Sequence, residues 1–417
     1  MLHNGSLINT VHNNSNENDL KNIIDNHVYL FLSRLHELVI RDGKLERIPK
    51  NTREENDTDT QGDNNMNTQH NKLINEIKKL LEANHNIVLH GAPGTGKTYL
   101  ARQVAKQILA NELNKDITEI TDNEVDEVTG FVQFHPSYDY TDFVEGLRPV
   151  PPDEGNKASK DVQFERKDGV FKEFCKKAIK NPDKKYIFII DEINRGNMSK
   201  IFGELFYSID PGYRVKFKKN ENGHYEKDEN DYVACVKTQY QNLIEKDDVF
   251  YKGFYVPENF YIIGTMNDID RSVECMDFAF RRRFVFKEIK AADNRDWLKN
   301  VLGDKYNRTI SVMDALNRAI YDEKSKDSKD SIKGLDASYH IGAAYFAKLK
   351  DMEFKYDKLW DLSLKPLLNE YVRGNRDPRG DLEKLEKAYK AAYDEASKEK
   401  SNEKVAGEEN SSETAHQ

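Results

Sequence analysis

Four short apolar runs alternate with amphipathic segments between residues 72 and 290, and each is a candidate buried strand. They cover residues 87–89, 131–134, 186–190 and 260–265. Continuous apolar runs of this length are typical of strands that are covered on both faces. Strands that alternate with helices favour a parallel arrangement. The pattern therefore predicts an α/β core in which helices cover both faces of a parallel sheet.

Two longer polar stretches interrupt this alternation. Residues 149–170 contain Pro151-Pro152 and many charges, and residues 214–255 resemble β-hairpin insertions on the core. Residues 291–380 carry apolar positions at helical spacing, which predicts a helical lid after the core. Residues 381–417 are rich in Lys and Glu. They predict a charged helix with a solvated face, followed by a flexible polar tail.

The chain before the core is expected to add little to the packed structure. Residues 1–50 predict a small helical segment, with one amphipathic helix over residues 19–41. Residues 51–71 consist mostly of Asn, Asp, Glu, Gln and Thr. Such a stretch cannot bury enough apolar surface to offset its ordering entropy, so it predicts a disordered linker. The core then begins near residue 72.

A glycine-rich loop follows the first apolar run and matches the pattern G-x-x-x-x-G-K-T. It consists of Gly91, Ala92, Pro93, Gly94, Thr95, Gly96, Lys97 and Thr98, and a helical pattern begins at Tyr99. Between a strand and a helix, such a loop closes its backbone N–H groups around phosphates, and the helix N-terminus adds partial positive charge. Lys97 is expected to reach the outer phosphates and the Thr98 hydroxyl to hold Mg²⁺. Residues 91–99 therefore predict a nucleoside triphosphate site.

An acidic pair, Asp191 and Glu192, follows the third apolar run. Ligands of parallel α/β sheets bind at the carboxyl ends of the strands. Asp191 can hold Mg²⁺ there, directly or through water, because this ion prefers oxygen ligands. Glu192 is then placed to polarise a water molecule aimed at the γ-phosphate. The pair favours hydrolysis over transfer to another acceptor.

The fourth run ends at Asn267, and an arginine cluster comes after it. An asparagine at a strand end can orient the attacking water, although it can also cap the following turn. The arginines are Arg271, Arg281, Arg282 and Arg283. An arginine supplied to a neighbour's site stabilises transition-state charge and contributes roughly 10³–10⁵ in rate. This order of features fits a ring-forming ATPase whose sites lie between subunits.

Composition narrows the class of protein further. The 417 residues are 33% charged and carry a net charge of −9, which argues against a surface that coats nucleic acid throughout. The three cysteines form no C-x-x-C pair, as expected for a reduced protein without a zinc or disulfide framework. No apolar run approaches the roughly 18 residues of a membrane span, and the first residues lack a secretory layout. We therefore expect a cytoplasmic protein without a membrane partner.

Taken together, these motifs resemble the AAA+ superfamily, and within it the McrB-type GTPase subunits of modification-dependent restriction systems. The match spans about 300 residues. Its segments are FHPSY (134–138), FVEG (143–146), DEINR (191–195), PENFYIIGTMN (257–267), DRS (270–272) and DFAFRRRF (277–284), with weaker ones at IGAAYF (341–346) and PLLNEY (366–371). The resemblance implies an AAA+ P-loop NTPase core, a C-terminal helical lid and assembly into a hexameric homo-oligomeric ring.

The resemblance also assigns roles to individual residues. Asn267 and Asp270 would help to position the hydrolytic water, and Asn194 and Arg195 would couple neighbouring subunits. Arg282 and Arg283 are the candidates for contacts in trans. His135 would lie near the nucleotide, as a catalytic residue or as a structural histidine. An McrC-like nuclease subunit would supply any DNA cleavage, and DNA would be contacted through the complex.

Two departures from the family pattern bear on the site. Asp268-Ile269 stands where the family has Thr-Ala, and Ala343-Ala344 stands where it has His-Ser in the lid motif. The first departure bears on the tuning of nucleotide preference. Because of the second, the role of the family's lid motif cannot be assigned to residues 343–344. Only about 70 residues precede the core, so the sequence gives no support for reading of methylated cytosine by this chain.

Two alternatives remain beside a restriction motor. One is a remodelling ATPase of the MoxR type that acts on a protein client, and the other is a nucleotide-gated scaffold with little turnover. The intact Lys97, Asp191, Glu192 and Asn267 argue against the scaffold. The glycine loop contacts only phosphates and cannot distinguish guanine from adenine. The substrate is therefore GTP or ATP, the family favouring GTP and the wider superfamily ATP.

Overall fold

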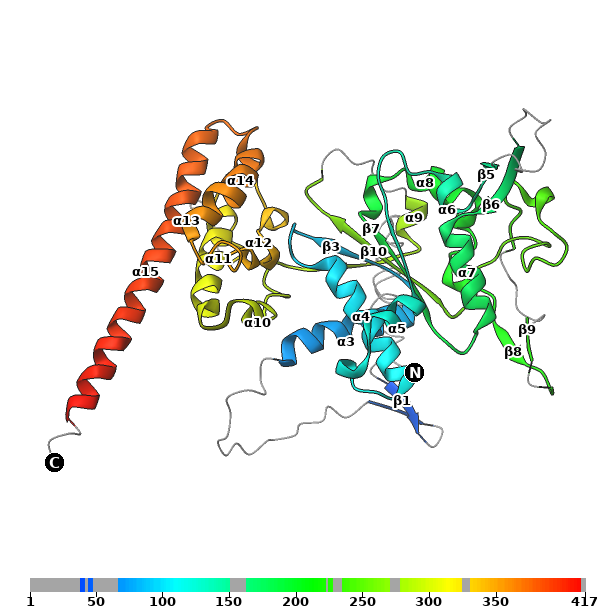
Figure 1. The fold of residues 1–417 in the computed structure, drawn as a ribbon, viewed down its shortest axis with the longest axis horizontal. Coiled ribbons are helices and arrows are strands. Elements are labelled where there is room, and N and C mark those ends of the chain that lie inside the picture. The colour runs from blue at the N-terminus through cyan, green and yellow to red at the C-terminus, as the bar shows by residue number, and fades with distance from the viewer. Residues whose placement is uncertain are drawn as a thin grey trace, which may run out of the picture. The chain divides into compact units, whose positions relative to one another are not determined.

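We analysed a computed structural model of the chain. It describes residues 38–41, 44–47, 67–150, 163–222, 224–227, 235–270, 278–324 and 331–413. The chain divides into two units, residues 1–62 and residues 63–417. The nucleotide motifs all belong to the second unit, and Figure 1 labels its elements.

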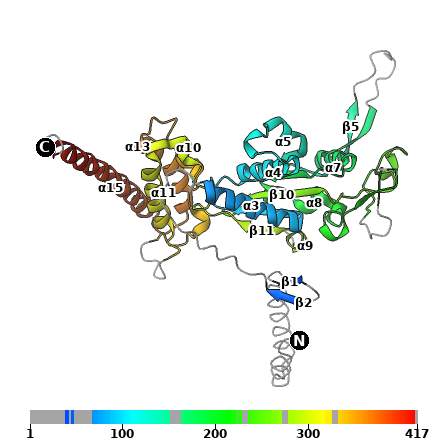
Figure 2. The same ribbon diagram turned by 90° about the horizontal axis from the view of Figure 1, so that it is seen from below.

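The first unit contributes a two-stranded hairpin (Figure 2). β1 (Leu38–Arg41) pairs antiparallel with β2 (Lys44–Arg47). The expected helix over residues 19–41 is therefore wrong at residues 38–41, and the rest of it lies outside the described residues. The sequence between the strands is Asp42-Gly43, a strong signal for a two-residue hairpin turn that outweighs the helical spacing before it.

The second unit is built on a five-stranded parallel sheet with the strand order β11-β3-β10-β7-β4. The strands are β3 (Asn86–Gly91), β4 (Thr129–Gln133), β7 (Tyr186–Asp191), β10 (Phe260–Asn267) and β11 (Val285–Glu288). All four predicted strands are confirmed. The fifth, β11, was not predicted, because it is an edge strand in which Lys287 and Glu288 interrupt the apolar pattern.

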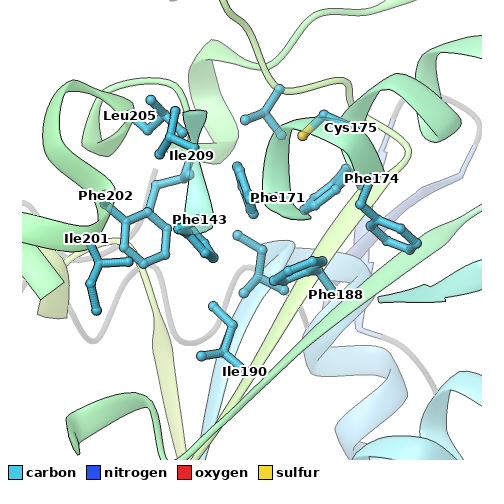
Figure 3. Packing of buried hydrophobic residues seen from close by; sticks show 14 of the residues in the cluster. Phe143, Phe171, Phe174, Cys175, Phe188, Ile190, Ile201, Phe202, Leu205 and Ile209 are labelled. Atoms are coloured by element: carbon cyan, nitrogen blue, oxygen red, sulfur yellow. The ribbon is translucent and has the colours of Figure 1, made fainter. Parts of the chain in front are cut away.

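Alternate residues of each central strand enter two different hydrophobic clusters. Ile187 and Ile189 pack on one face with α3 (Asn67–Asn84), α4 (Lys97–Leu113) and α5 (Asp122–Val128). Phe188 and Ile190 pack on the other face, among aromatic side chains that include Phe171 of α7 (Val170–Lys180) and Phe202 of α8 (Met198–Phe202). Figure 3 shows this aromatic cluster. Helices on both faces confirm the predicted α/β class, and α3 corrects the linker, which cannot extend beyond residue 66.

A β-hairpin occurs at each of the two polar stretches that interrupt the core pattern, as expected for residues 214–255. β5 (Glu145–Val150) pairs with β6 (Gln163–Asp168), and β8 (Phe217–Lys219) pairs with β9 (Tyr225–Lys227). An ion pair fixes the base of the first hairpin to α7. The Lys172 ammonium lies 2.6 Å from a Glu145 carboxylate oxygen, and both side chains are fully buried. Burial alone would raise the pKa of Glu145, but Lys172 together with hydrogen bonds from Thr238 and the Tyr240 N–H outweighs it, and the pKa is lowered.

Glu145→Ala is expected to lower the free energy of unfolding by about 3 kcal/mol, because it leaves the buried Lys172 without its nearest counter-charge. Asp168 remains 3.5 Å from Lys172, which keeps the loss from being larger. Urea unfolding measures it. Glu165→Ala on the same hairpin is the control, because Glu165 is exposed and its 3.9 Å ion pair with Lys167 contributes little. Equal losses in the two variants would contradict the prediction.

C-terminal helices form a separate cluster around buried residues such as Leu298, Leu316 and Trp360. The helices are α10 (Leu298–Leu302), α11 (Tyr306–Ile320), α12 (Ala343–Ala347), α13 (Tyr356–Leu359), α14 (Lys365–Val372) and α15 (Pro378–Glu413). They are the lid that the sequence predicted. The charged helix α15 also has a buried face, because Leu385 and Tyr389 pack in this cluster. Within the described part of the chain, no helix has the length and apolarity to cross a bilayer.

Candidate functional site

The phosphate loop runs from the end of β3 to the start of α4, as the sequence predicted. Gly96 is the N-cap of α4 and has φ 81°, a left-handed conformation that favours glycine. Gly91 has φ 138°, and a Cβ there would collide with the Ile289 carbonyl. Both glycines are thus needed for the loop to turn closely into the helix.

Tyr99, in the first turn of α4, is half exposed, and its ring centroid lies 6.3 Å from that of His70.

Lys97 is buried beneath this loop, with 7% of its surface exposed. Its ammonium donates to the carbonyls of Gly91 and Ala92 at 3.0 and 2.8 Å and to Asn267 Oδ1 at 2.9 Å. Burial lowers the pKa of Lys97 to about 8, while the charges of Asp268 and Glu192 oppose the shift. The amine therefore keeps its charge at neutral pH.

Asp191 lies at the end of β7 and is held by three donors. The hydroxyls of Thr98 and Thr265 each donate to Asp191 Oδ1 at 2.6 Å, and Gln133 Nε2 donates to Oδ2 at 3.0 Å. The Thr98 hydroxyl and the Asp191 carboxylate are oxygen ligands in direct contact, so they fit Mg²⁺. Nowhere in the described ranges do three or more His, Cys, Asp or Glu side chains gather as a metal site. A cation here would complete its shell with substrate and water oxygens.

Glu192 begins the turn after β7 with φ 51°, an unusual conformation for a residue other than glycine. Its Oε1 accepts from Asn267 Nδ2 at 2.9 Å, and its Oε2 lies 3.3 Å from Arg195 Nε. Burial raises the pKa of the Glu192 carboxyl, and Arg195 limits the rise. A half-buried carboxylate with a raised pKa is suited to accepting a proton from water.

Three further residues to which the resemblance assigns roles, Asn194, Arg195 and Asp270, lie around Glu192. Arg195 Nη2 donates to Asp270 Oδ2 at 3.0 Å, so Arg195 bridges Asp270 and Glu192. Asn194 is buried, and its Nδ2 donates to the Asn267 carbonyl at 3.4 Å. The structure thus brings together the predicted residues of the glycine loop, the acidic pair and the Asn267–Asp270 segment.

The arginine cluster and His135 stand apart from this network. Arg282 is exposed after α9 (Phe278–Arg281). Arg283 is only 8% exposed, donates to the Ala279 carbonyl and lies 5.8 Å from the Phe206 ring, which is at odds with a contact in trans. His135 is exposed, with its ring edge-on to Tyr138. Arg271 lies outside the described residues.

The structure adds contacts between the lid and the phosphate loop that the sequence did not predict. Three successive loop carbonyls accept hydrogen bonds: Pro93 from Gly342 N at 3.0 Å, Gly94 from Ala344 N at 2.9 Å, and Thr95 from Asn294 Nδ2 at 3.0 Å. A Cβ on Gly342 would collide with the Gly94 backbone. The only signal in the sequence was the weak IGAAYF match, because two of the three donors are backbone N–H groups, which carry no residue signature.

Residues 86–284 match the family model of the AAA domain, dynein-related subfamily. The sheet order, the phosphate loop and the Asp191–Glu192 strand end agree with that match. The chain belongs to the AAA+ superfamily. The resemblance to McrB-type subunits is also confirmed, because the AAA+ chain is similar to a restriction subunit of that name.

Two curated relatives support this assignment. The chain is 35% identical over 303 residues to the type IV methyl-directed restriction enzyme EcoKMcrB subunit of Escherichia coli K12, covering 72% of this chain and 56% of that protein. It is 28% identical over 275 residues to the type II restriction enzyme BsuMI component YdiS of Bacillus subtilis 168, covering 60% of this chain and 71% of that protein. This AAA+ chain thus spans about half the length of the Escherichia coli relative.

Proposed function

We propose that this AAA+ protein hydrolyses a nucleoside triphosphate and acts as the motor subunit of an McrBC-like restriction complex. One observation carries the catalytic part of the proposal: the Asn267 amide joins Lys97 to Glu192, with contacts of 2.9 Å on each side. The cation for the outer phosphates and the acceptor for the water proton are thereby held in one rigid arrangement. The names of both relatives support the restriction role.

In the proposed reaction, the backbone of residues 91–98 cradles the phosphates and Lys97 neutralises the outer ones. Mg²⁺, when bound at Thr98 and Asp191, supplies additional positive charge to the phosphate oxygens. The oxygen of a water molecule attacks the γ-phosphorus and the bond to the β-phosphate oxygen breaks. Glu192 accepts the water proton, and Asn267 orients both Glu192 and the water. The products are a nucleoside diphosphate and phosphate.

GTP is the proposed substrate, because the McrB-type resemblance favours it over ATP. Phosphate release from GTP and from ATP tests this proposal when each is measured alone, with DNA, and with an McrC-like nuclease subunit. Turnover of GTP with DNA cleavage in the complete mixture would support the motor role. Tight nucleotide binding without turnover in every mixture would instead indicate a scaffold. Efficient hydrolysis of ATP without hydrolysis of GTP would overturn the choice of guanine as the base.

We also propose a homo-oligomeric ring, a hexamer by the family resemblance, in which Arg282 reaches the site of a neighbouring subunit. Of the two arginines expected in trans, Arg282 is the exposed one. Removing its charge from the transition state would cost roughly 10³–10⁵ in rate. The McrC-like nuclease subunit and DNA are the further proposed partners.

Mixing inactive Arg282→Ala subunits with inactive Glu192→Gln subunits is expected to restore part of the hydrolysis rate. In mixed rings, some interfaces combine an intact Glu192 with an intact Arg282 from the neighbour. Phosphate release measured across mixing ratios tests this expectation. Arg281→Ala is the control, because the Arg281 guanidinium packs 5.5 Å from the Phe286 ring of its own chain. Mixtures that never exceed the sum of their parts would rule out action in trans.

A further inference from the structure

A histidine–aspartate contact that the proposed chemistry does not use lies beside the site. His90 Nδ1 is 2.9 and 3.1 Å from the two carboxylate oxygens of Asp268. A carboxylate only accepts hydrogen bonds, so Nδ1 carries the proton. In addition, the backbone N–H of Asp268 donates to the Gly91 carbonyl at 3.3 Å. The first residue after β10 is therefore tied to the end of β3 by both its side chain and its backbone.

The surroundings of this pair favour a fixed geometry. The side chains of His90 and Asp268 are about one quarter exposed, at 24% and 23%. On the neighbouring edge strand, Phe286 packs against the His90 ring with centroids 6.0 Å apart and an interplanar angle of 60°. A charge-assisted hydrogen bond that is partly shielded from water is stronger than an exposed one. The ring is thus held between β11 on one side and Asp268 on the other.

Two residues next to Asp268 contact Glu192, one directly and one through Arg195. Asn267 precedes Asp268 and donates directly to Glu192 Oε1. Asp270 follows two residues later and contacts Arg195, which lies 3.3 Å from Glu192 Oε2. A displacement of this segment therefore moves the partners of both Glu192 oxygens together.

We infer that His90 and Asp268 are positioning residues for hydrolysis, which hold residues 267–270 so that Asn267 and Asp270 orient Glu192. The inference rests on the proposed hydrolytic function. Asp268 stands where the resembled family has threonine, and His90 is the partner that accommodates the acid in this chain. A misplacement of about 1 Å in a catalytic arrangement can cost on the order of 100-fold in rate, so a small shift of this segment is sufficient.

The test compares His90→Ala, Asp268→Ala and the double variant with the wild type. Each single variant is expected to lower kcat by about 10- to 100-fold. Affinity for a fluorescent nucleotide analogue is measured at about pH 6, where Lys97 stays charged even without the Asp268 carboxylate. It is expected to stay within about threefold of wild type, because the loop and the charge of Lys97 are intact. The double variant should lose no more kcat than the more impaired single variant, since both substitutions break the same His90–Asp268 contact.

His90→Asn separates positioning from general folding, because its amide nitrogen lies near the position of His90 Nδ1 and donates to Asp268. It is expected to recover most of kcat. Lys115→Ala, which breaks a 3.0 Å contact with Glu124 beyond the far end of α4, is the matched surface control and leaves kcat unchanged. Thermal unfolding of all variants verifies that they are folded.

Wild-type kcat in either alanine variant, or additive losses in the double variant, would overturn the inference while leaving the hydrolytic function in place. Losses of affinity and thermal stability that parallel the loss of kcat would also overturn it, since they indicate a structural contact only. If the wild type hydrolyses neither GTP nor ATP, the proposed function fails and the inference fails with it.

Discussion

Lys97→Ala is expected to weaken nucleotide binding by at least about 100-fold. Hydrogen bonds to charged groups contribute about 1.5–3 kcal/mol each, and a lysine that spans the outer phosphates makes at least two of them. The loss extends to the catalytic side, because Asn267 Oδ1 accepts from the same ammonium at 2.9 Å. Titration with a fluorescent nucleotide analogue measures the effect. Lys115→Ala, just beyond the other end of the same helix, is the control and should bind normally.

The lowered pKa of Lys97 adds a pH dependence to this prediction. Burial brings that pKa to about 8, so the charged form that binds phosphate is complete well below pH 8 and is lost above it. Wild-type affinity is therefore expected to decline above pH 8, by at most tenfold per pH unit, whereas Lys97→Ala should show no such decline. Affinity that is flat from pH 7 to 9.5 in the wild type would contradict the assigned role of Lys97.

The sequence predicted the central strands well because buried parallel strands are continuous apolar runs, as in β7 and β10. It failed at β11, where one face is only partly covered and charged residues interrupt the pattern. It also failed at β1, where the hairpin signal of Asp42-Gly43 competes with helical spacing. The apolar pattern thus predicts strands that are buried on both faces. It is less informative for edge strands and for small hairpins.

For the site, sequence reasoning predicted residues whose type is dictated by phosphate chemistry, such as Lys97, Asp191 and Glu192, and the structure places them together. It did not predict the contacts around them. His90 and Asp268 are 178 positions apart, and Asn294 lies 199 positions from Thr95, so no local pattern links them. The three consecutive arginines read as one cluster, yet only tertiary packing decides that Arg283 turns inward while Arg282 stays exposed.

Glu192→Gln is expected to bind nucleotide normally and to hydrolyse it about 10²- to 10⁴-fold more slowly, the usual contribution of a general base. Glutamine keeps an oxygen that can accept from Asn267 Nδ2, so the arrangement around Lys97 survives while the proton acceptor is lost. Single-turnover phosphate release gives the rate, and analogue binding gives the affinity. Asp126→Asn, in an exposed ion pair with Arg102, is the matched acid-to-amide control.

The pH profile sharpens this last prediction, because the base must be deprotonated to act. Burial raises the pKa of Glu192, so the acidic limb of the wild-type kcat profile should lie above the range of an ordinary carboxyl group. Activity is then lost as the pH falls through that raised pKa. Arg195→Ala removes the charge that limits the rise, so it should move the acidic limb to still higher pH. A limb that stays at the same pH in Arg195→Ala, or a Glu192→Gln variant with wild-type turnover, would assign the proton acceptor to another group.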